Sequence, residues 1–130
     1  MSVAYVDASL IVSLLDRTDS NHEVANRWIR SWREEIVSSV IAEVEVSRAL
    51  ARRQASVAAL RQVAGLFATF EPVAVSPQIR STAAALTPRS LRSLDAIHVA
   101  TAVVAQVDWF ATLDLRQSVG AEEAGLRLAL

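Results

Sequence analysis

Short apolar segments that favour strands alternate along this chain with segments that have helical periodicity. The first apolar run is Val3–Val6, and residues 109–112 form a similar run near the other end of the chain. Strands that alternate with helices typically form a parallel sheet with helices on both faces. The sequence therefore predicts one α/β domain over residues 1–130, with a central, mostly parallel sheet of about four to five short strands.

The other elements are expected from the spacing of apolar residues. Further strands are predicted at residues 36–37, 72–75 and 126–130. Helices are predicted at residues 8–15, 21–32, 40–53, 56–70, 77–86, 93–106 and 115–119. The helix at 93–106 has almost no polar face, so it should be central, and we interpret its His98 as a packed, hydrogen-bonded core residue. With only three glycines and three prolines in the chain, the loops should be short.

Four acidic residues stand far apart, each among apolar or small residues: Asp7, Glu43, Asp95 and Asp114. Burying a carboxylate is costly unless its charge is compensated. Asp7 and Asp114 follow predicted strands, and open α/β sheets bind ligands beyond the carboxyl ends of their strands. If the fold gathers the four acids, they form an oxygen-rich site for a hard divalent cation, which indicates metal-dependent phosphodiester chemistry.

Each acid also has a structural interpretation, and the residues alone leave both open. Asp7 suits a helix N-cap and Asp114 suits a turn. Glu43 and Asp95 lie near predicted helix starts, where a negative charge is stabilised. Glu45 lies about 200° around the helix from Glu43, so the two cannot face one site. We therefore assign Glu45 to the solvated face or to a salt link.

Composition excludes several classes of protein. There is no cysteine, which excludes disulfides and thiolate metal sites. No apolar run approaches the ~20 residues that span a bilayer, and the first residues lack the basic start of a signal peptide, so we expect a cytoplasmic protein. The net charge of -1 does not suit a protein that grips nucleic acid through phosphate contacts alone.

Rival enzymes with acids at strand ends are also disfavoured. A phospho-accepting domain usually needs a lysine, and every basic residue here is arginine. An acid-phosphatase-like hydrolase needs a second aspartate where Ser9 stands. No glycine-rich nucleotide-binding loop is present. The alternative that remains is a non-enzymatic interaction module, in which the acids are helix caps and part of the 52% hydrophobic content forms a partner interface.

Five segments resemble the PIN-domain family, and within it the VapC-type toxins of bacterial toxin–antitoxin pairs. They are VDASLIVSLL, NHEVANRWI, SSVIAEVEVSRAL, LRSLDAIHVATA and FATLD, of which the fourth is the most specific. The resemblance covers nearly the whole chain and implies a three-layer PIN-like fold with an acidic site for Mg²⁺ or Mn²⁺. The family's acids match Asp7, Glu43, Asp95 and Asp114, and its hydroxyl residues match Ser9 and Thr112. The last motif departs from the family, because Leu-Arg-Gln follows Asp114 in place of the usual basic run.

The resemblance further implies an endoribonuclease toxin that forms a homodimer and is inhibited by a cognate antitoxin inserting into the site. We expect Asp7 and Asp95 to bind the metal directly, with Glu43 and Asp114 acting through water. Because the acids repel phosphate, arginines should help to hold the RNA substrate. The candidates are Arg17, Arg48, Arg52, Arg53, Arg89, Arg92 and Arg116. Three of them, at 48, 52 and 53, share one predicted helix and suit a solvated face equally well.

Overall fold

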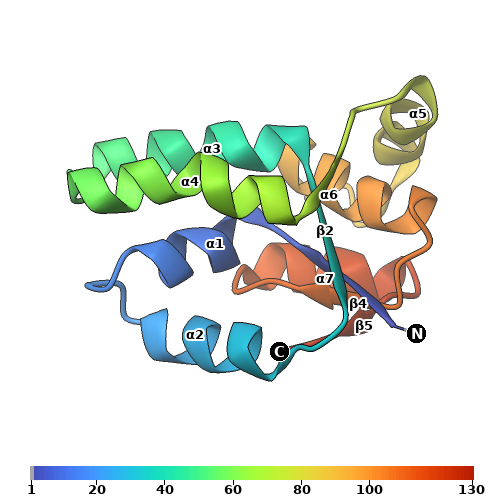
Figure 1. Ribbon diagram of the computed structural model, residues 1–130. Coiled ribbons are helices and arrows are strands. Elements are labelled where there is room, and N and C mark those ends of the chain that lie inside the picture. Colours follow the sequence, from blue (N-terminus) through green and yellow to red (C-terminus); the bar gives the residue numbers. More distant parts are fainter. Residues whose placement is uncertain (1) are drawn as a thin grey trace.

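A five-stranded parallel sheet forms the centre of the protein. Figure 1 shows the computed structural model, which describes residues 2–130. The strands pair in the order β3-β2-β1-β4-β5, and every pairing is parallel. They are β1 (Val3–Val6), β2 (Glu35–Ser39), β3 (Glu71–Val73), β4 (Trp109–Ala111) and β5 (Arg127–Leu128). The predicted parallel sheet of short strands is confirmed.

Helices occupy the predicted segments, with ends that differ by a few residues. They are α1 (Ala8–Leu15), α2 (His22–Ser31), α3 (Val40–Arg52), α4 (Val57–Thr69), α5 (Pro77–Ala85), α6 (Ser93–Val104) and α7 (Leu115–Glu123). Serine side chains cap three of them, because Ser39, Ser56 and Ser76 each accept a hydrogen bond from a first-turn backbone N–H. Within residues 2–130, every helix is too short or too polar to cross a bilayer.

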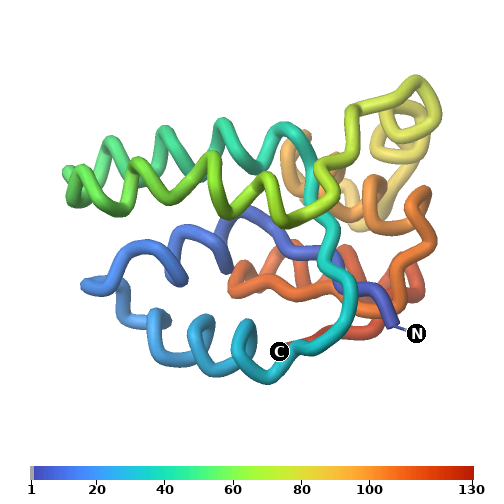
Figure 2. The backbone as a smooth tube through the Cα atoms, viewed as in Figure 1, coloured from blue at the N-terminus to red at the C-terminus, as the bar shows by residue number. Residues whose placement is uncertain are grey.

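Alternate residues of β1 face two separate cores. Ala4 and Val6 pack in a cluster with residues of α1, α2, α3 and α4, whereas Tyr5 packs in a second cluster with residues of α6 and α7. This alternation follows from the two-residue period of a strand. Figure 2 shows α3 and α4 side by side as an antiparallel pair over one face of the sheet. The helices therefore cover both faces, and the three-layer architecture predicted from the sequence is confirmed.

The strand order creates a crevice beside β1. From β1 the chain proceeds to β2 and then β3 at one edge, and it later returns to β4 and β5 on the other side of β1. The carboxyl ends of β1 and β4 therefore flank the point at which the strand order reverses, where open α/β sheets bind their ligands. Asp7 is the first residue after β1, and Thr112 is the first after β4.

Candidate active site

Asp7 is a fully buried carboxylate that is held by neutral donors. Its side chain has no exposed surface, and its Oδ1 caps α1 by accepting from the Leu10 N–H at 3.2 Å. The Ser9 hydroxyl lies 2.8 Å from both carboxylate oxygens, and the Thr112 hydroxyl donates to Oδ2 at 2.6 Å. Burial raises the pKa of Asp7, an effect that the hydroxyls of Thr112 and Ser9 partly offset. The cap interpretation of Asp7 is thus confirmed, and its carboxylate has no ion-pair partner among residues 2–130.

Hydrogen bonds connect Asp7 to two of the other predicted acids. The Thr112 hydroxyl oxygen accepts from the Asp114 N–H at 3.0 Å, and Asp114 in turn caps α7 by accepting from the Gln117 N–H at 3.2 Å. The Gln117 side-chain amide donates to Asp95 at 3.2 Å. Asp7, Asp114 and Asp95 therefore belong to one continuous network that runs through Thr112 and Gln117.

Gln117 is a member of this network that the sequence did not reveal. Its side chain is buried, with 5% exposure, and its Oε1 has no hydrogen-bond partner within residues 2–130. A buried, unpaired amide oxygen is costly, so such atoms usually face a water or an ion. The sequence signal that could have identified Gln117 is its position, three residues after Asp114 and inside the first turn of the helix that Asp114 caps.

The two glutamates of α3 have different surroundings. Glu43 is exposed in the first turn of α3. Glu45 is half-buried, and one of its oxygens lies 2.5 Å from Nε2 of the fully buried His98, so Glu45 is bound to a partner and does not lie on a solvated face. The other ring nitrogen of His98 lies 2.6 Å from the Tyr5 hydroxyl. The interpretation of His98 as a hydrogen-bonded core residue is confirmed, whereas the catalytic role of Glu43 stays a prediction.

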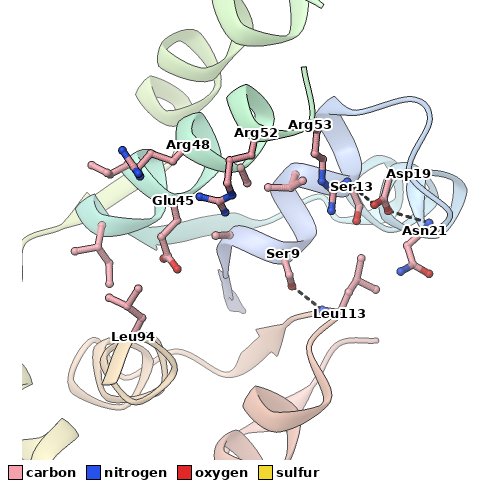
Figure 3. Close-up of a pocket in the computed structure, with 15 residues that line it drawn as sticks. Ser9, Ser13, Asp19, Asn21, Glu45, Arg48, Arg52, Arg53, Leu94 and Leu113 are labelled. Atoms are coloured by element: carbon pink, nitrogen blue, oxygen red, sulfur yellow. Dashed lines mark hydrogen bonds and ion pairs between the residues drawn. The ribbon is translucent and has the colours of Figure 1, made fainter. Parts of the chain in front are cut away.

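A cavity of about 650 Å³ lies next to Glu45. Helix α3 forms one wall, and α1, Leu94 of α6 and the loop residue Leu113 form the others. Figure 3 shows Glu45 and Arg52 extending into this space, with Ser9 on the α1 side. Asp7, Asp95 and Asp114 are outside the lining, so the acid network lies beside this cavity, and Ser9 contributes to both.

Three arginines on α3 and at its end line the cavity, and they differ in how they are paired. Arg53 is bound by two carboxylates, Asp19 at 2.6 Å and Asp16 at 3.2 Å. Arg48 and Arg52 are exposed and have no carboxylate within ion-pair distance among the described residues. The last two are therefore the free positive charges on this wall.

Comparison with known proteins decides the family. The model of the PIN domain family matches residues 4–122. The chain belongs to the PIN-domain family. It is 36% identical to ribonuclease VapC35 of Mycobacterium tuberculosis over 128 residues, which cover 94% of this chain and 92% of that protein.

Two solved structures share the fold of this PIN domain at low sequence identity. One is VapC20 of Mycobacterium tuberculosis, described as a sarcin-ricin loop cleaving toxin, with a TM-score of 0.78, 20% identity and coverage of 89% of this chain and 93% of that chain. The other is a toxin–antitoxin complex from Klebsiella pneumoniae, with a TM-score of 0.71, 21% identity and coverage of 90% and 91%. Likeness at this identity establishes the fold alone.

The acids of this PIN domain do not form a preassembled metal cluster. Within residues 2–130, no group of three or more histidine, cysteine or acidic side chains is placed so that it could hold a metal ion. Mg²⁺ keeps several waters and needs only one or two protein carboxylates, so it does not require such a cluster. The desolvated charge of Asp7 and the unpaired Oε1 of Gln117 beside Asp95 both suit a hydrated hard cation. The residues present therefore fit Mg²⁺ or Mn²⁺ held partly through water.

Proposed function

We propose that this PIN domain is a metal-dependent endoribonuclease, the toxin of a toxin–antitoxin pair, which hydrolyses RNA phosphodiesters. The observation that carries the proposal is the buried Asp7 carboxylate at the reversal of the strand order, linked through Thr112 and Gln117 to Asp114 and Asp95. Kinship with a protein named as a ribonuclease, over nearly the full length of both chains, supports the RNA substrate.

Asp7 and Asp95 would hold the cation directly, with Asp114 acting through water. Helix α3 would contribute Glu45 in place of Glu43, because Glu45 lines the cavity and is anchored by His98. When bound, Mg²⁺ or Mn²⁺ would neutralise the phosphate charge and lower the pKa of the attacking water.

The other residues of the network position these acids. Ser9 and Thr112 orient the Asp7 carboxylate, and Gln117 orients Asp95. The free guanidinium groups of Arg48 and Arg52 would hold an RNA phosphate, which arginine can bind through two parallel hydrogen bonds. Among the candidate arginines, Arg53 has a structural role, since its charge is already paired; the others stay predictions.

An antitoxin segment would bind in the same cavity as the substrate. The cavity combines apolar residues, including Val12, Ile41 and Val44, with the free Arg48 and Arg52. This pattern suits an amphipathic segment with acidic residues. The Klebsiella pneumoniae toxin–antitoxin complex, which has the same fold, supports a protein partner. Homodimer formation and a cytoplasmic location are part of the same proposal.

Charge-removing substitutions test the proposal. Asp7→Asn retains a good N-cap residue, so it removes the charge while preserving the cap. We expect Asp7→Asn and Asp95→Asn each to abolish cleavage of labelled RNA in Mg²⁺, with unchanged circular dichroism. EDTA should abolish cleavage by the wild type. Full activity in both variants would contradict the site, and full activity in excess EDTA would contradict the metal requirement.

A non-enzymatic interaction module is a second candidate, because Asp7 and Asp114 do cap helices. In that case the wild type would cleave no RNA with Mg²⁺ or Mn²⁺, yet it would still bind a partner through the cavity. Expression in a bacterial host separates the two functions. A toxin stops growth, and Asp95→Asn relieves the arrest, whereas an interaction module gives equal growth with both proteins.

A further inference from the structure

A buried histidine joins three elements of the fold, β1, α6 and α3. His98 lies on α6, about one turn after Asp95, and has no exposed surface. Its Nδ1 is 2.6 Å from the hydroxyl of Tyr5, which precedes Asp7 by two residues on β1. Its Nε2 is 2.5 Å from Glu45 on α3. One imidazole ring therefore connects β1, α6 and α3 directly behind the proposed site.

The Glu45 carboxylate sets the tautomer of the ring. An ionised carboxylate only accepts hydrogen bonds, so Nε2 of His98 carries a hydrogen and donates it to Glu45. In the neutral ring Nδ1 is then an acceptor, and the Tyr5 hydroxyl, which can donate or accept, donates to it. Both ring nitrogens are then satisfied without a buried charge on the ring.

We propose that His98 is a positioning residue that holds Glu45 at the cavity wall beside the acid network, in the tautomer that donates from Nε2. This inference rests on the proposed function, because it concerns the same site. The bond from His98 occupies Oε1 of Glu45 and leaves the other carboxylate oxygen free to act in the site.

Without this anchor, Glu45 has a competing partner on its own helix. Arg48 lies three residues further along α3, a spacing at which opposite charges attract. Glu45 is only partly buried, with 28% of its side chain exposed, so it has room to turn. Pairing with Arg48 would withdraw the acid from the site and an arginine from the RNA phosphate. His98 therefore keeps Glu45 and Arg48 apart. Glu45 stays available to the site, and Arg48 stays available to the RNA phosphate.

Substitutions at His98 test the proposal by Mn²⁺ binding in the absence of RNA. We expect His98→Leu to weaken Mn²⁺ binding, measured by titration calorimetry, about 10-fold, as Glu45→Gln does. His98→Gln should restore most of the affinity, because its amide N–H can replace the Nε2 donor. The double variant Glu45→Gln with His98→Leu should bind no worse than either single variant, since both remove one interaction. With RNA, His98→Leu should lower kcat and also raise KM, because the freed Glu45 pairs with Arg48 and withdraws that arginine from the phosphate.

The chain offers a matched control in its only other histidine. His22 contacts the backbone oxygen of Ser13 and none of the acids, so His22→Gln should leave Mn²⁺ affinity unchanged. In the His22→Gln variant His98 is the one histidine left in the chain, so the imidazole signals of its ¹⁵N NMR spectrum belong to His98. We expect that ring to show a hydrogen on Nε2 and none on Nδ1, and Glu45→Gln to shift it towards a mixture of tautomers, because an amide can donate or accept. Neither spectrum requires a substitution at His98, so they decide the question even if His98→Leu fails to fold.

The possible outcomes separate this role from the function itself. If Glu45→Gln weakens Mn²⁺ binding and His98→Leu does not, the positioning role is wrong and the metal site stands. A wild-type ring with its hydrogen on Nδ1 would also overturn the role. If Glu45→Gln and Asp95→Asn both bind Mn²⁺ as the wild type does, the metal site fails and the role of His98 fails with it.

Discussion

The buried charge of Asp7 should cost the metal-free protein stability, so its removal should stabilise the fold while it abolishes catalysis. Burial raises the pKa of Asp7, which means that the folded protein binds this proton more tightly than the unfolded chain does. The contribution of Asp7 to stability is therefore greatest below its ordinary pKa of 3.8, and it falls as the pH rises towards the raised pKa of the folded state. Asp7→Asn should abolish this part of the pH dependence.

The expected size follows from the cost of a desolvated charge. In the wild type the hydroxyl donors and the helix cap offset part of this cost. We therefore expect Asp7→Asn to raise the free energy of unfolding by about 1–2 kcal/mol at pH 7 in EDTA, a range common for single stabilising substitutions. For a chain of 130 residues the entropy of unfolding is about 0.27 kcal/mol/K. The melting temperature should therefore rise by about 4–7 °C.

Thermal unfolding from pH 4 to 8, with and without Mg²⁺, checks this expectation. In EDTA the difference between Asp7→Asn and wild type should grow with pH. Mg²⁺ at 100 times its Kd should stabilise the wild type by about 2.7 kcal/mol and the variant much less. Asp114→Asn is the matched control, because Asp114 also caps a helix. It should change the free energy of unfolding less than Asp7→Asn does, because Asp114 is only partly buried. A destabilised Asp7→Asn protein at pH 7 in EDTA would show that Asp7 is a satisfied structural cap, and would refute the reasoning.

Three further predictions concern neighbouring residues. In the RNA cleavage assay, Glu45→Gln should lower kcat at least about 10-fold, while Glu43→Gln retains activity. The reverse result would show that Glu43 is the glutamate of α3 that acts in catalysis. Thr112→Val should lower the free energy of unfolding by about 2 kcal/mol, because a buried carboxylate loses its hydroxyl donor; an unchanged denaturation midpoint would contradict the network. Arg52→Met should raise KM for RNA about 10-fold, whereas Arg53→Met, whose side chain is 44% exposed, should cost under about 1 kcal/mol of stability and leave KM unchanged.

Much of the fold was predictable because this chain carries strong local signals. Alternation of apolar runs with helical segments predicts a parallel sheet, and the helices expected from residues 40, 56 and 77 begin in the structure at serine caps, at 39, 56 and 76. The ends of the strands were also predictable. Asp7 and Thr112 directly follow β1 and β4, so they lie at the crevice. The exact strand order was not predictable, because it depends on which helix crosses which face of the sheet, and local sequence does not encode that choice.

The two glutamates of α3 show where sequence reasoning about the site stops. The sequence shows that Glu43 and Glu45 point apart, but the buried stripe of the helix, formed by Ala42, Val46 and Leu50, runs between them. Periodicity therefore identifies the face that packs on the core and leaves both flanks equivalent. What distinguishes the flanks is tertiary: a histidine from α6, more than fifty residues away in sequence, meets only the Glu45 flank. A carboxylate anchored by a buried donor from another helix has a defined position, and an exposed first-turn glutamate does not.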